Sequence, residues 1–288
     1  MSRRESSLLK ESKDLAELYG IKPQKKFGQN FLIDDLTYID IIESADLDKS
    51  DRVLEVGPGL GFLTMSLAER VAEVAAVELD RKLAKVLPER LQLFGYNNTH
   101  VHQANILDFP RITGLEDFFD KPYKVVANLP YNITSVFLRK FLESEHKPVS
   151  LTLLLQKEVA QRICDRPGQM SLLALSVQFF AEAKYCFAVD KTKFWPKPQV
   201  QSGVVHLVVK NKLPLPEKSL KSFWRLVHIG FSAKRKMLKK NLAAALDLDT
   251  EDFAKILVQI KINPEARAQE LSLDNWLKLF ALLEHGVL

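Results

Sequence analysis

The sequence predicts an α/β protein with a mostly parallel, Rossmann-like sheet and a small all-α C-terminal domain. From residue 52 to residue 164, short apolar segments alternate with amphipathic segments. Strands that alternate with helices form parallel sheets with right-handed crossovers. A glycine-rich turn follows the first apolar segment, and only helical patterns follow a Pro-containing linker at 213–216. A chain of 288 residues is long enough for two such domains.

The alternating pattern defines the expected elements. Strands are expected at 52–56, 73–77, 100–104, 123–127 and 150–156. Helices are expected at 34–45, 62–70, 81–94, 133–141, 157–164 and 172–181. Two further strands, 185–189 and 204–209, flank Pro-rich sequence and are expected to form an antiparallel pair at the sheet edge. The C-terminal helices are expected at 219–230, 235–246, 250–260 and 272–283.

Composition narrows the class of protein. No apolar run reaches the ~18 residues of a membrane span, and the N-terminus lacks the apolar core of a secretory signal. Cys164 and Cys186 are the only cysteines, which is too few for a disulfide framework and gives no metal-site spacing. We therefore expect a cytoplasmic protein without a metal and without a membrane partner.

Positive charge is concentrated in one segment. Seven Lys or Arg residues and no acid lie between Lys221 and Asn241. Such clusters neutralise phosphates in nucleic-acid-binding proteins, although a basic run by itself is also typical of a solvated helix face.

The turn between the first strand and its helix, Gly57-Pro-Gly-Leu-Gly61, indicates a nucleoside site. Gly57 and Gly59 allow close approach of the backbone, but the spacing is not the Gly-x-Gly-x-x-Gly of dinucleotide-binding proteins. Glu78 ends the second strand about 20 residues later, where a carboxylate can accept hydrogen bonds from both ribose hydroxyls. An exposed charge or a helix N-cap is the alternative for Glu78, but Asp80 fits the capping role better.

The third strand supplies the rest of this cleft. Leu79 and Ile106 can sandwich an adenine ring, and Asn105 can meet its amino edge. Together with Asn128 on the fourth strand, these residues indicate S-adenosylmethionine, whose sulfonium needs no general base to make the methyl group reactive.

The tetrapeptide Asn128-Leu129-Pro130-Tyr131 follows the fourth strand. An adenine N6 amine is a poor nucleophile because its lone pair is delocalised into the ring. The Asn128 side chain and a backbone carbonyl near Pro130 can bind both N6 hydrogens, while Tyr131 stacks on the base, a contact worth roughly 1–3 kcal/mol. Taken alone, the same residues are equally typical of a turn at a strand end.

With these pieces placed, the chain resembles the rRNA adenine N6-dimethyltransferases, specifically the bacterial small-subunit (16S) type, from about Lys25 to its C-terminus. Asn128 to Tyr131 match the catalytic tetrapeptide, and Leu129 is similar to the small-subunit branch, whereas Ile is typical of large-subunit resistance methylases. The segment 27–32 (Phe-Gly-Gln-Asn-Phe-Leu) resembles the motif that places Gln29, Asn30 and Leu32 beside the methionine portion of the cofactor.

Two further motifs carry the resemblance. The segment 194–202 resembles the family's Phe-x-Pro-x-Pro-x-Val-x-Ser loop, which implies that Phe194 packs on the flipped base opposite Tyr131. The segment 231–241 resembles the family's basic helix start, and its candidate RNA-binding residues are Lys234, Arg235, Lys236, Lys239 and Lys240.

The resemblance implies a class I methyltransferase that transfers two methyl groups to each of two adjacent adenines in a hairpin near the 3′ end of 16S rRNA. It implies S-adenosylmethionine as methyl donor, a pre-30S particle as partner and a monomeric enzyme. The expected domains are a leader (1–24), a methyltransferase domain (25–211) and a helical rRNA-binding domain (212–288).

One position departs from the family pattern, and three other functions stay open. The family usually has Asp where this chain has Asn105, which predicts somewhat weaker cofactor binding; Asp108 is a substitute whose spacing fits less well. A DNA adenine methyltransferase shares the Asn-x-Pro-Tyr chemistry, and a large-subunit rRNA methylase differs mainly at Leu129. A ribosome-assembly factor that acts chiefly by binding is the third alternative.

Overall fold

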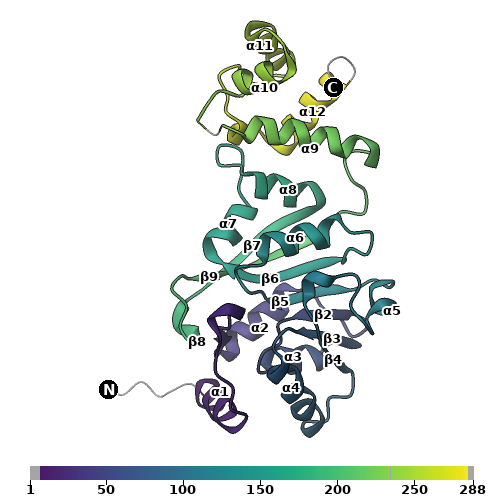
Figure 1. Cartoon of the computed structure of the whole chain (residues 1–288), viewed down its shortest axis with the longest axis vertical. Helices are drawn as coiled ribbons and strands as arrows, with labels where there is room; N and C mark the ends of the chain where they lie inside the picture. The colour runs from purple at the N-terminus through teal and green to yellow at the C-terminus, as the bar shows by residue number, and fades with distance from the viewer. Residues whose placement is uncertain (1–6, 234, 285–288) are drawn as a thin grey trace. The chain divides into compact units, whose positions relative to one another are not determined.

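The chain forms two compact units in the computed structural model, which describes residues 7–233 and 235–284 (Figure 1). The first unit contains Met1–Gln161 and Glu182–Val209, and the second contains Arg162–Ala181 and Lys210–Leu288. None of the helices in the described part of the chain is both long enough and apolar enough to cross a membrane.

A seven-stranded mixed sheet forms the first unit. Its strands, from one edge to the other, are β4 (Thr99–Gln103), β3 (Glu73–Glu78), β2 (Arg52–Val56), β5 (Lys124–Asn128), β6 (Ser150–Gln156), β9 (Ser202–Val209) and β7 (Ala181–Val189). The first five are parallel to one another, and β9 runs antiparallel to β6. The interiors of β2, β3, β5 and β6 are almost wholly buried, as is typical of a parallel sheet covered on both faces.

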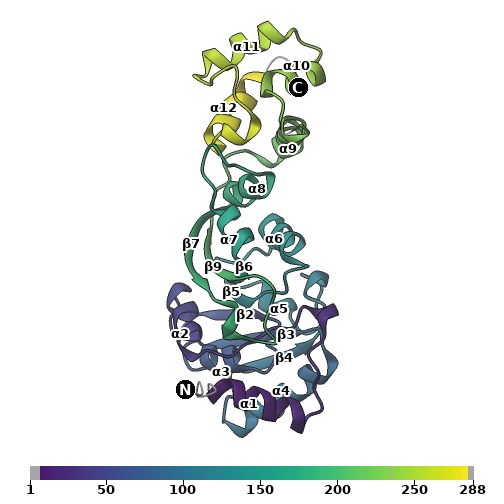
Figure 2. The same ribbon diagram turned by 90° about the vertical axis from the view of Figure 1, so that its left-hand side faces the viewer.

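Helices cover both faces of this sheet, and Figure 2 shows α2 (Asp35–Ser44) and α6 (Thr134–Glu143) on opposite sides of it. The helices that follow the strands β2, β3, β4 and β6 are, in that order, α3 (Phe62–Ala68), α4 (Arg81–Leu93), α5 (Glu116–Phe119) and α7 (Lys157–Ile163). Side-chain caps fix where two of the helices begin: Asp34 accepts from the backbone N of Thr37, and Asp80 accepts from that of Lys82.

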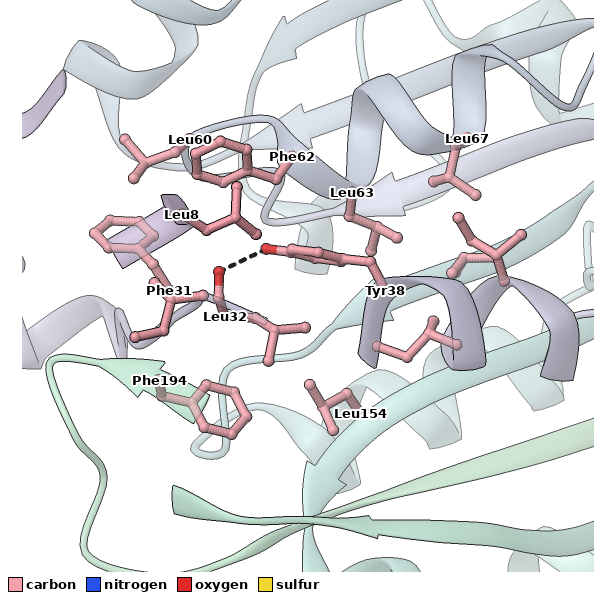
Figure 3. Packing of buried hydrophobic residues seen from close by; sticks show 14 of the residues in the cluster. Leu8, Phe31, Leu32, Tyr38, Leu60, Phe62, Leu63, Leu67, Leu154 and Phe194 are labelled. Carbon is pink, nitrogen blue, oxygen red and sulfur yellow. Dashed lines mark hydrogen bonds between the residues drawn. The ribbon is translucent and has the colours of Figure 1, made fainter. Parts of the chain in front are cut away.

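A second, two-stranded sheet joins segments that lie far apart in the sequence. β1 (Phe31–Leu32) pairs antiparallel with β8 (Phe194–Trp195), so that Leu32 lies opposite Phe194. The helix α1 (Ser7–Leu18) precedes β1 and contributes Leu8 to the cluster of buried side chains around it. Figure 3 shows this cluster, in which the hydroxyl of Tyr38 donates to the Leu32 carbonyl over 2.8 Å.

The second unit is helical: α8 (Leu172–Phe180), α9 (Glu217–Phe231), α10 (Leu238–Leu246), α11 (Thr250–Gln259) and α12 (Leu273–Glu284). Its core is aromatic, with Phe179 against Phe223 at 5.3 Å between ring centroids and Phe223 against Phe280 at 5.6 Å. Trp276 is fully buried against Gly230, where a Cβ atom would lie 2.3 Å from the indole ring.

The predicted fold class is confirmed: the sheet is mostly parallel, an antiparallel strand lies near its edge, and the C-terminal elements are helices. Two boundaries differ from the expectation by three residues or more. β7 begins directly after α8 at Ala181 instead of at residue 185, and α10 begins at Leu238 instead of 235. The later start of α10 has a local cause, since the backbone N of Lys236 donates to the Ala233 carbonyl and forms a turn there.

Candidate active site at the carboxyl ends of the strands

A pocket opens where the strand order reverses, between β2 and β5, whose residues Val56 and Ala127 are register partners. Open α/β sheets bind ligands at this switch point, outside the carboxyl ends of the strands. All ten residues predicted to bind a cofactor line this one pocket: Gln29, Asn30, Leu32, Gly57, Gly59, Glu78, Leu79, Asn105, Ile106 and Asn128. Pro130 and Tyr131 line it as well.

The glycine loop, residues 57–61, forms one wall of the pocket with backbone atoms. Gly59 has φ of 58°, a conformation that favours glycine, and a Cβ atom there would lie 3.1 Å from the ring of Phe31. Its backbone N donates to Glu78 Oε2 over 3.1 Å. Glycine is therefore needed both for the turn and for the close approach of this backbone to its neighbours.

Glu78 lies at the end of β3 with 6% of its surface exposed, and its other carboxylate oxygen accepts from the backbone N of Asp80 over 2.8 Å. Burial raises the pKa of Glu78, while the two backbone donors oppose that shift. A carboxylate oxygen can accept more than one hydrogen bond, so the fixed carboxylate is suited to bind a pair of vicinal hydroxyls.

A second acid, Glu55, lines the same pocket, and its role was not predicted from the sequence. It is 1% exposed in β2, and one of its carboxylate oxygens has no hydrogen-bond partner among the described residues. Burial is the main cause that raises the pKa of Glu55 to about 8, and the Glu78 carboxylate acts in the same direction. The sequence signal that could have identified Glu55 is an acidic residue inside an otherwise apolar strand.

We expect the folded chain to lose stability as the pH rises from about 4.5, the ordinary pKa of Glu55, to about 8, its folded pKa. In this window the folded chain holds a proton that the unfolded chain has released, so alkali favours unfolding. Glu55→Gln removes this dependence, and its stability relative to the wild type should rise by on the order of 4 kcal/mol between about pH 5 and about pH 9. Urea unfolding at both pH values measures this, with the exposed Glu89→Gln as the control. An unchanged pH dependence in Glu55→Gln contradicts the assignment.

Residues that follow β3 and β4 also line the pocket. Leu79 is 48% exposed and Ile106 is buried, which leaves the Leu79 side chain available to a planar ligand. Asn105 accepts from the backbone N of Leu107 over 3.0 Å and so caps the short helical turn Ile106–Asp108. The cap fixes the side chain of Asn105 at the pocket wall.

Asn128 ends β5, and its amide is oriented by the N-terminal segment. The Nδ2 atom donates to the Asn30 carbonyl over 3.2 Å, which leaves Oδ1 as the acceptor half of the group. The Pro130 carbonyl accepts from the backbone N of Ile133 and retains a second lone pair. Asn128 Oδ1 and this backbone therefore supply acceptors for an amine that carries two hydrogens.

Tyr131 is half-buried, and its hydroxyl lies 2.7 Å from the Oγ of Ser202 at the start of β9. Burial raises the pKa of Tyr131, so the phenol is neutral at physiological pH. Ser202 ends the segment 194–202 and is a site residue to which the sequence pattern assigned no role. Its bond fixes the edge of the Tyr131 ring.

Phe194 is not among the residues that line the pocket. It is 3% exposed in β8 and belongs to the buried cluster of Figure 3, with Leu32 and Leu154. Stacking of Phe194 on a target base stays a prediction, and it requires the ring to leave this packing.

The N-terminal segment meets the pocket through its amides. Gln29 donates from Nε2 to Asp80 Oδ2 over 3.0 Å and accepts from the backbone N of Gln24 over 2.7 Å. Asn30 donates to the Gly28 carbonyl over 3.1 Å. The Gln29 side chain thus ties this segment to Asp80, after β3, and the carbonyl of Asn30 accepts from Asn128 at the end of β5.

The predicted RNA-binding residues lie in the second unit, before and within α10. Arg235, Lys236 and Lys240 are exposed, and Lys234 lies outside the described residues. Lys239 differs, because its Nζ is 2.7 Å from Glu265 Oε1 and this contact raises the pKa of Lys239. The positive charge at Lys239 is therefore already neutralised. No group of three or more His, Cys, Asp or Glu side chains that could hold a metal occurs in the described ranges.

The matches to known proteins cover both the part of the chain that forms the pocket and the part that forms the helical unit. Ribosomal RNA small subunit methyltransferase A from Dehalococcoides mccartyi (strain CBDB1) is 40% identical over 275 residues, 95% of this chain and 92% of the relative. The protein of that name from Rippkaea orientalis is 41% identical over 273 residues, 91% of this chain and 98% of the relative.

Solved structures of two rRNA or adenosine methyltransferases also match this chain. A dimethyladenosine transferase from Plasmodium falciparum matches with a TM-score of 0.76 and 25% identity, over 89% of this chain and 98% of the other. The 23S rRNA methyltransferase ErmE matches with a TM-score of 0.73 and 28% identity, over 88% and 100%. Residues 20–285 match the family model described as ribosomal RNA adenine dimethylase. The chain therefore belongs to the ribosomal RNA adenine dimethylase family of S-adenosylmethionine-dependent methyltransferases.

Proposed function

We propose that this protein dimethylates the N6 amines of two adjacent adenines in a hairpin near the 3′ end of 16S rRNA, during maturation of the small subunit. The observation that carries the proposal is the pair of acceptors, Asn128 Oδ1 and the backbone at Pro130, placed beside a nucleoside pocket at the switch point of the sheet. Relatives of 38–41% identity that bear the name small subunit methyltransferase A support the choice of subunit.

The pocket fits S-adenosylmethionine. Its backbone wall at Gly59 leaves little room for a Cβ atom, which would lie 3.1 Å from the Phe31 ring, and the Glu78 carboxylate suits the ribose hydroxyls. When bound, the cofactor supplies an electrophilic methyl group. We assign its ribose to Glu78, its adenine to Leu79, Asn105 and Ile106, and its methionine portion to the segment Gln29 to Leu32.

The side chains around Asn128 prepare the target amine. Extrusion of the target base from folded RNA costs a few kcal/mol, and stacking of that base on Tyr131 offsets this cost. Asn128 Oδ1 and the Pro130 region accept the two N6 hydrogens and orient the nitrogen lone pair toward the methyl group, and this positioning supplies most of the rate gain. A second transfer requires room for the first methyl on N6.

The cofactor role of Asn105 predicts a gain of affinity in Asn105→Asp. Aspartate caps the turn at Leu107 as well as asparagine does, and a charged acceptor forms a hydrogen bond about twice as strong. We expect the Kd for S-adenosylmethionine to fall roughly three- to tenfold, measured by calorimetry. Asp108→Asn is the matched control and should change Kd little; an unchanged Kd in Asn105→Asp would place the adenine elsewhere.

The helical segment 212–288 is proposed to grip rRNA phosphates, next to a methyltransferase domain at 25–211 and a leader at 1–24. Exposed Arg235 and Lys236 carry the prediction. The double variant Arg235→Ala/Lys236→Ala should weaken binding to pre-30S particles and reduce the slope of log Kd against log salt by about one for each phosphate that is no longer neutralised. Lys239→Ala is the control, because Glu265 already pairs with that ammonium. Equal effects of the two variants would argue against the assignment.

A substrate competition tests the proposed function. The enzyme, acting as a cytoplasmic monomer, is offered pre-30S particles without adenine methylation, deproteinised large-subunit rRNA and duplex DNA, each with labelled S-adenosylmethionine. We expect label in 16S rRNA only. Label only in large-subunit rRNA would make it a resistance-type enzyme, and label only in DNA would make it a DNA adenine methyltransferase.

A further inference from the structure

The side chain of Arg90 connects the N-terminal helix α1 to the glycine loop. It is 4% exposed on α4, and its Nη1 donates to the carbonyl of Leu60 inside the glycine loop. Its Nη2 donates to Glu11 Oε1 of α1 over 3.0 Å, and its Cζ lies 5.1 Å from the ring centroid of Phe62. One guanidinium thus bridges the leader and the cofactor wall.

The glycine loop needs such external support. Gly57, Gly59 and Gly61 have positive φ values of 68°, 58° and 87°, and glycine loses more conformational freedom on ordering than any other residue. Leu60 is buried, so its carbonyl would lack a donor without Arg90, and a buried unpaired carbonyl is unfavourable. The bond from Arg90 therefore stabilises the loop conformation that the cofactor requires.

The leader reaches the ribose acid by a second path. Gln24 and Gln29 both donate to Asp80 Oδ2, over 3.1 and 3.0 Å, and the backbone N of Asp80 donates to Glu78 Oε1. Lys82 donates from Nζ to the Gly20 carbonyl at the end of the leader. Both anchors of the cofactor, the loop and Glu78, are thus tied to residues 7–29.

The helix α1 is docked by its own apolar face. Leu8 and Ala16 belong to the same buried cluster as Phe31, Leu60 and Phe62, and Figure 3 shows Leu8 beside these side chains. The residues that match the family model begin at 20, so α1 lies outside them.

We propose that α1 is a brace for the cofactor pocket, in which Glu11 and Arg90 are positioning residues that hold the glycine loop in its binding conformation. The proposal rests on the assignment of S-adenosylmethionine to this pocket. On this proposal, α1 increases the affinity for the cofactor. If α1 only stabilised the fold, changes in α1 would leave that affinity unchanged.

The test compares two neutralising variants of α1 in the full chain. Glu11→Gln weakens the anchor of Arg90, and Asp14→Asn removes the same charge from an exposed position of the same helix. We expect Glu11→Gln to raise the Kd and KM for S-adenosylmethionine roughly three- to tenfold with kcat at saturation within about twofold, and Asp14→Asn to change neither. Calorimetry and initial rates, both well below the unfolding temperature, supply the values.

A double-mutant cycle separates positioning from general damage. Arg90→Lys keeps the charge but replaces the two nitrogens that reach Leu60 and Glu11 with a single one, so its effect on Kd and that of Glu11→Gln should be non-additive. If Glu11→Gln lowers the unfolding temperature and leaves Kd unchanged, the positioning role proposed for Glu11 and Arg90 is wrong. Glu78→Gln is the reference variant. Normal binding of S-adenosylmethionine by Glu78→Gln would overturn the assignment of the pocket. Weak binding by Glu78→Gln together with normal binding by Glu11→Gln would overturn only the role proposed for α1.

Discussion

Asn128→Ala is expected to reduce the rate of methyl transfer at saturating substrates by about 10²–10³-fold, the usual effect of removing one preorganised polar group from an active site. The variant loses the Oδ1 acceptor that orients N6, while the glycine loop and Glu78 remain in place. Binding of pre-30S particles should stay within about twofold. Single-turnover transfer of labelled methyl groups measures the loss.

Asn132→Ala is the matched control, since Asn132 lines the same pocket and is exposed. Its rate should stay close to that of the wild type. Near-normal transfer by Asn128→Ala would mean that N6 is oriented by other groups. A variant that binds but cannot methylate also separates catalysis from assembly, because normal subunit maturation in its presence would favour a role that depends chiefly on binding.

Glu78→Gln should raise the Kd for S-adenosylmethionine by about 30- to 100-fold. The carboxylate accepts from the backbone N atoms of Gly59 and Asp80, and a glutamine of the same size turns an NH₂ group toward one of these donors. The charge that would bind the ribose hydroxyls is also lost. Calorimetric titration of the full chain measures the change.

Glu73→Gln, at the opposite end of the same strand, removes only an ion pair with Arg52 and should leave Kd unchanged. The pH dependence gives a second check. Burial raises the pKa of Glu78, so affinity in the wild type should fall as the pH drops through that raised pKa, while Glu78→Gln should show a flatter profile. Equal Kd values for Glu78→Gln and the wild type would contradict the ribose assignment.

The sequence alone was sufficient for the sheet and for the residues around the pocket, because the relevant patterns are local. Each apolar segment and its following turn can be recognised separately, and parallel strands bring their carboxyl ends to one edge. For this reason Gly57, Glu78, Asn105 and Asn128, which lie far apart in the chain, could be assigned to one site before the structure.

The interactions that the sequence did not reveal join distant segments without a local signal. Nothing near Phe194 indicates that it pairs with Leu32 and is buried, and nothing near Arg90 indicates Glu11 as its partner. Asn105 was predicted to contact adenine, whereas its role as cap of Leu107 depends on backbone geometry. Glu55 was not assigned a role because strand residues are normally structural, and only the fold places it at the pocket.

The function we propose is methyl transfer from S-adenosylmethionine, bound in this pocket, to adenine N6 in small-subunit rRNA. The most direct measurement is nucleoside analysis of 16S rRNA from unmethylated pre-30S particles after reaction with the enzyme and labelled cofactor. We predict N6,N6-dimethyladenosine at two adjacent positions of one hairpin, and none with Asn128→Ala. Label in any other nucleoside, or tight particle binding with no labelled nucleoside, would contradict the claim.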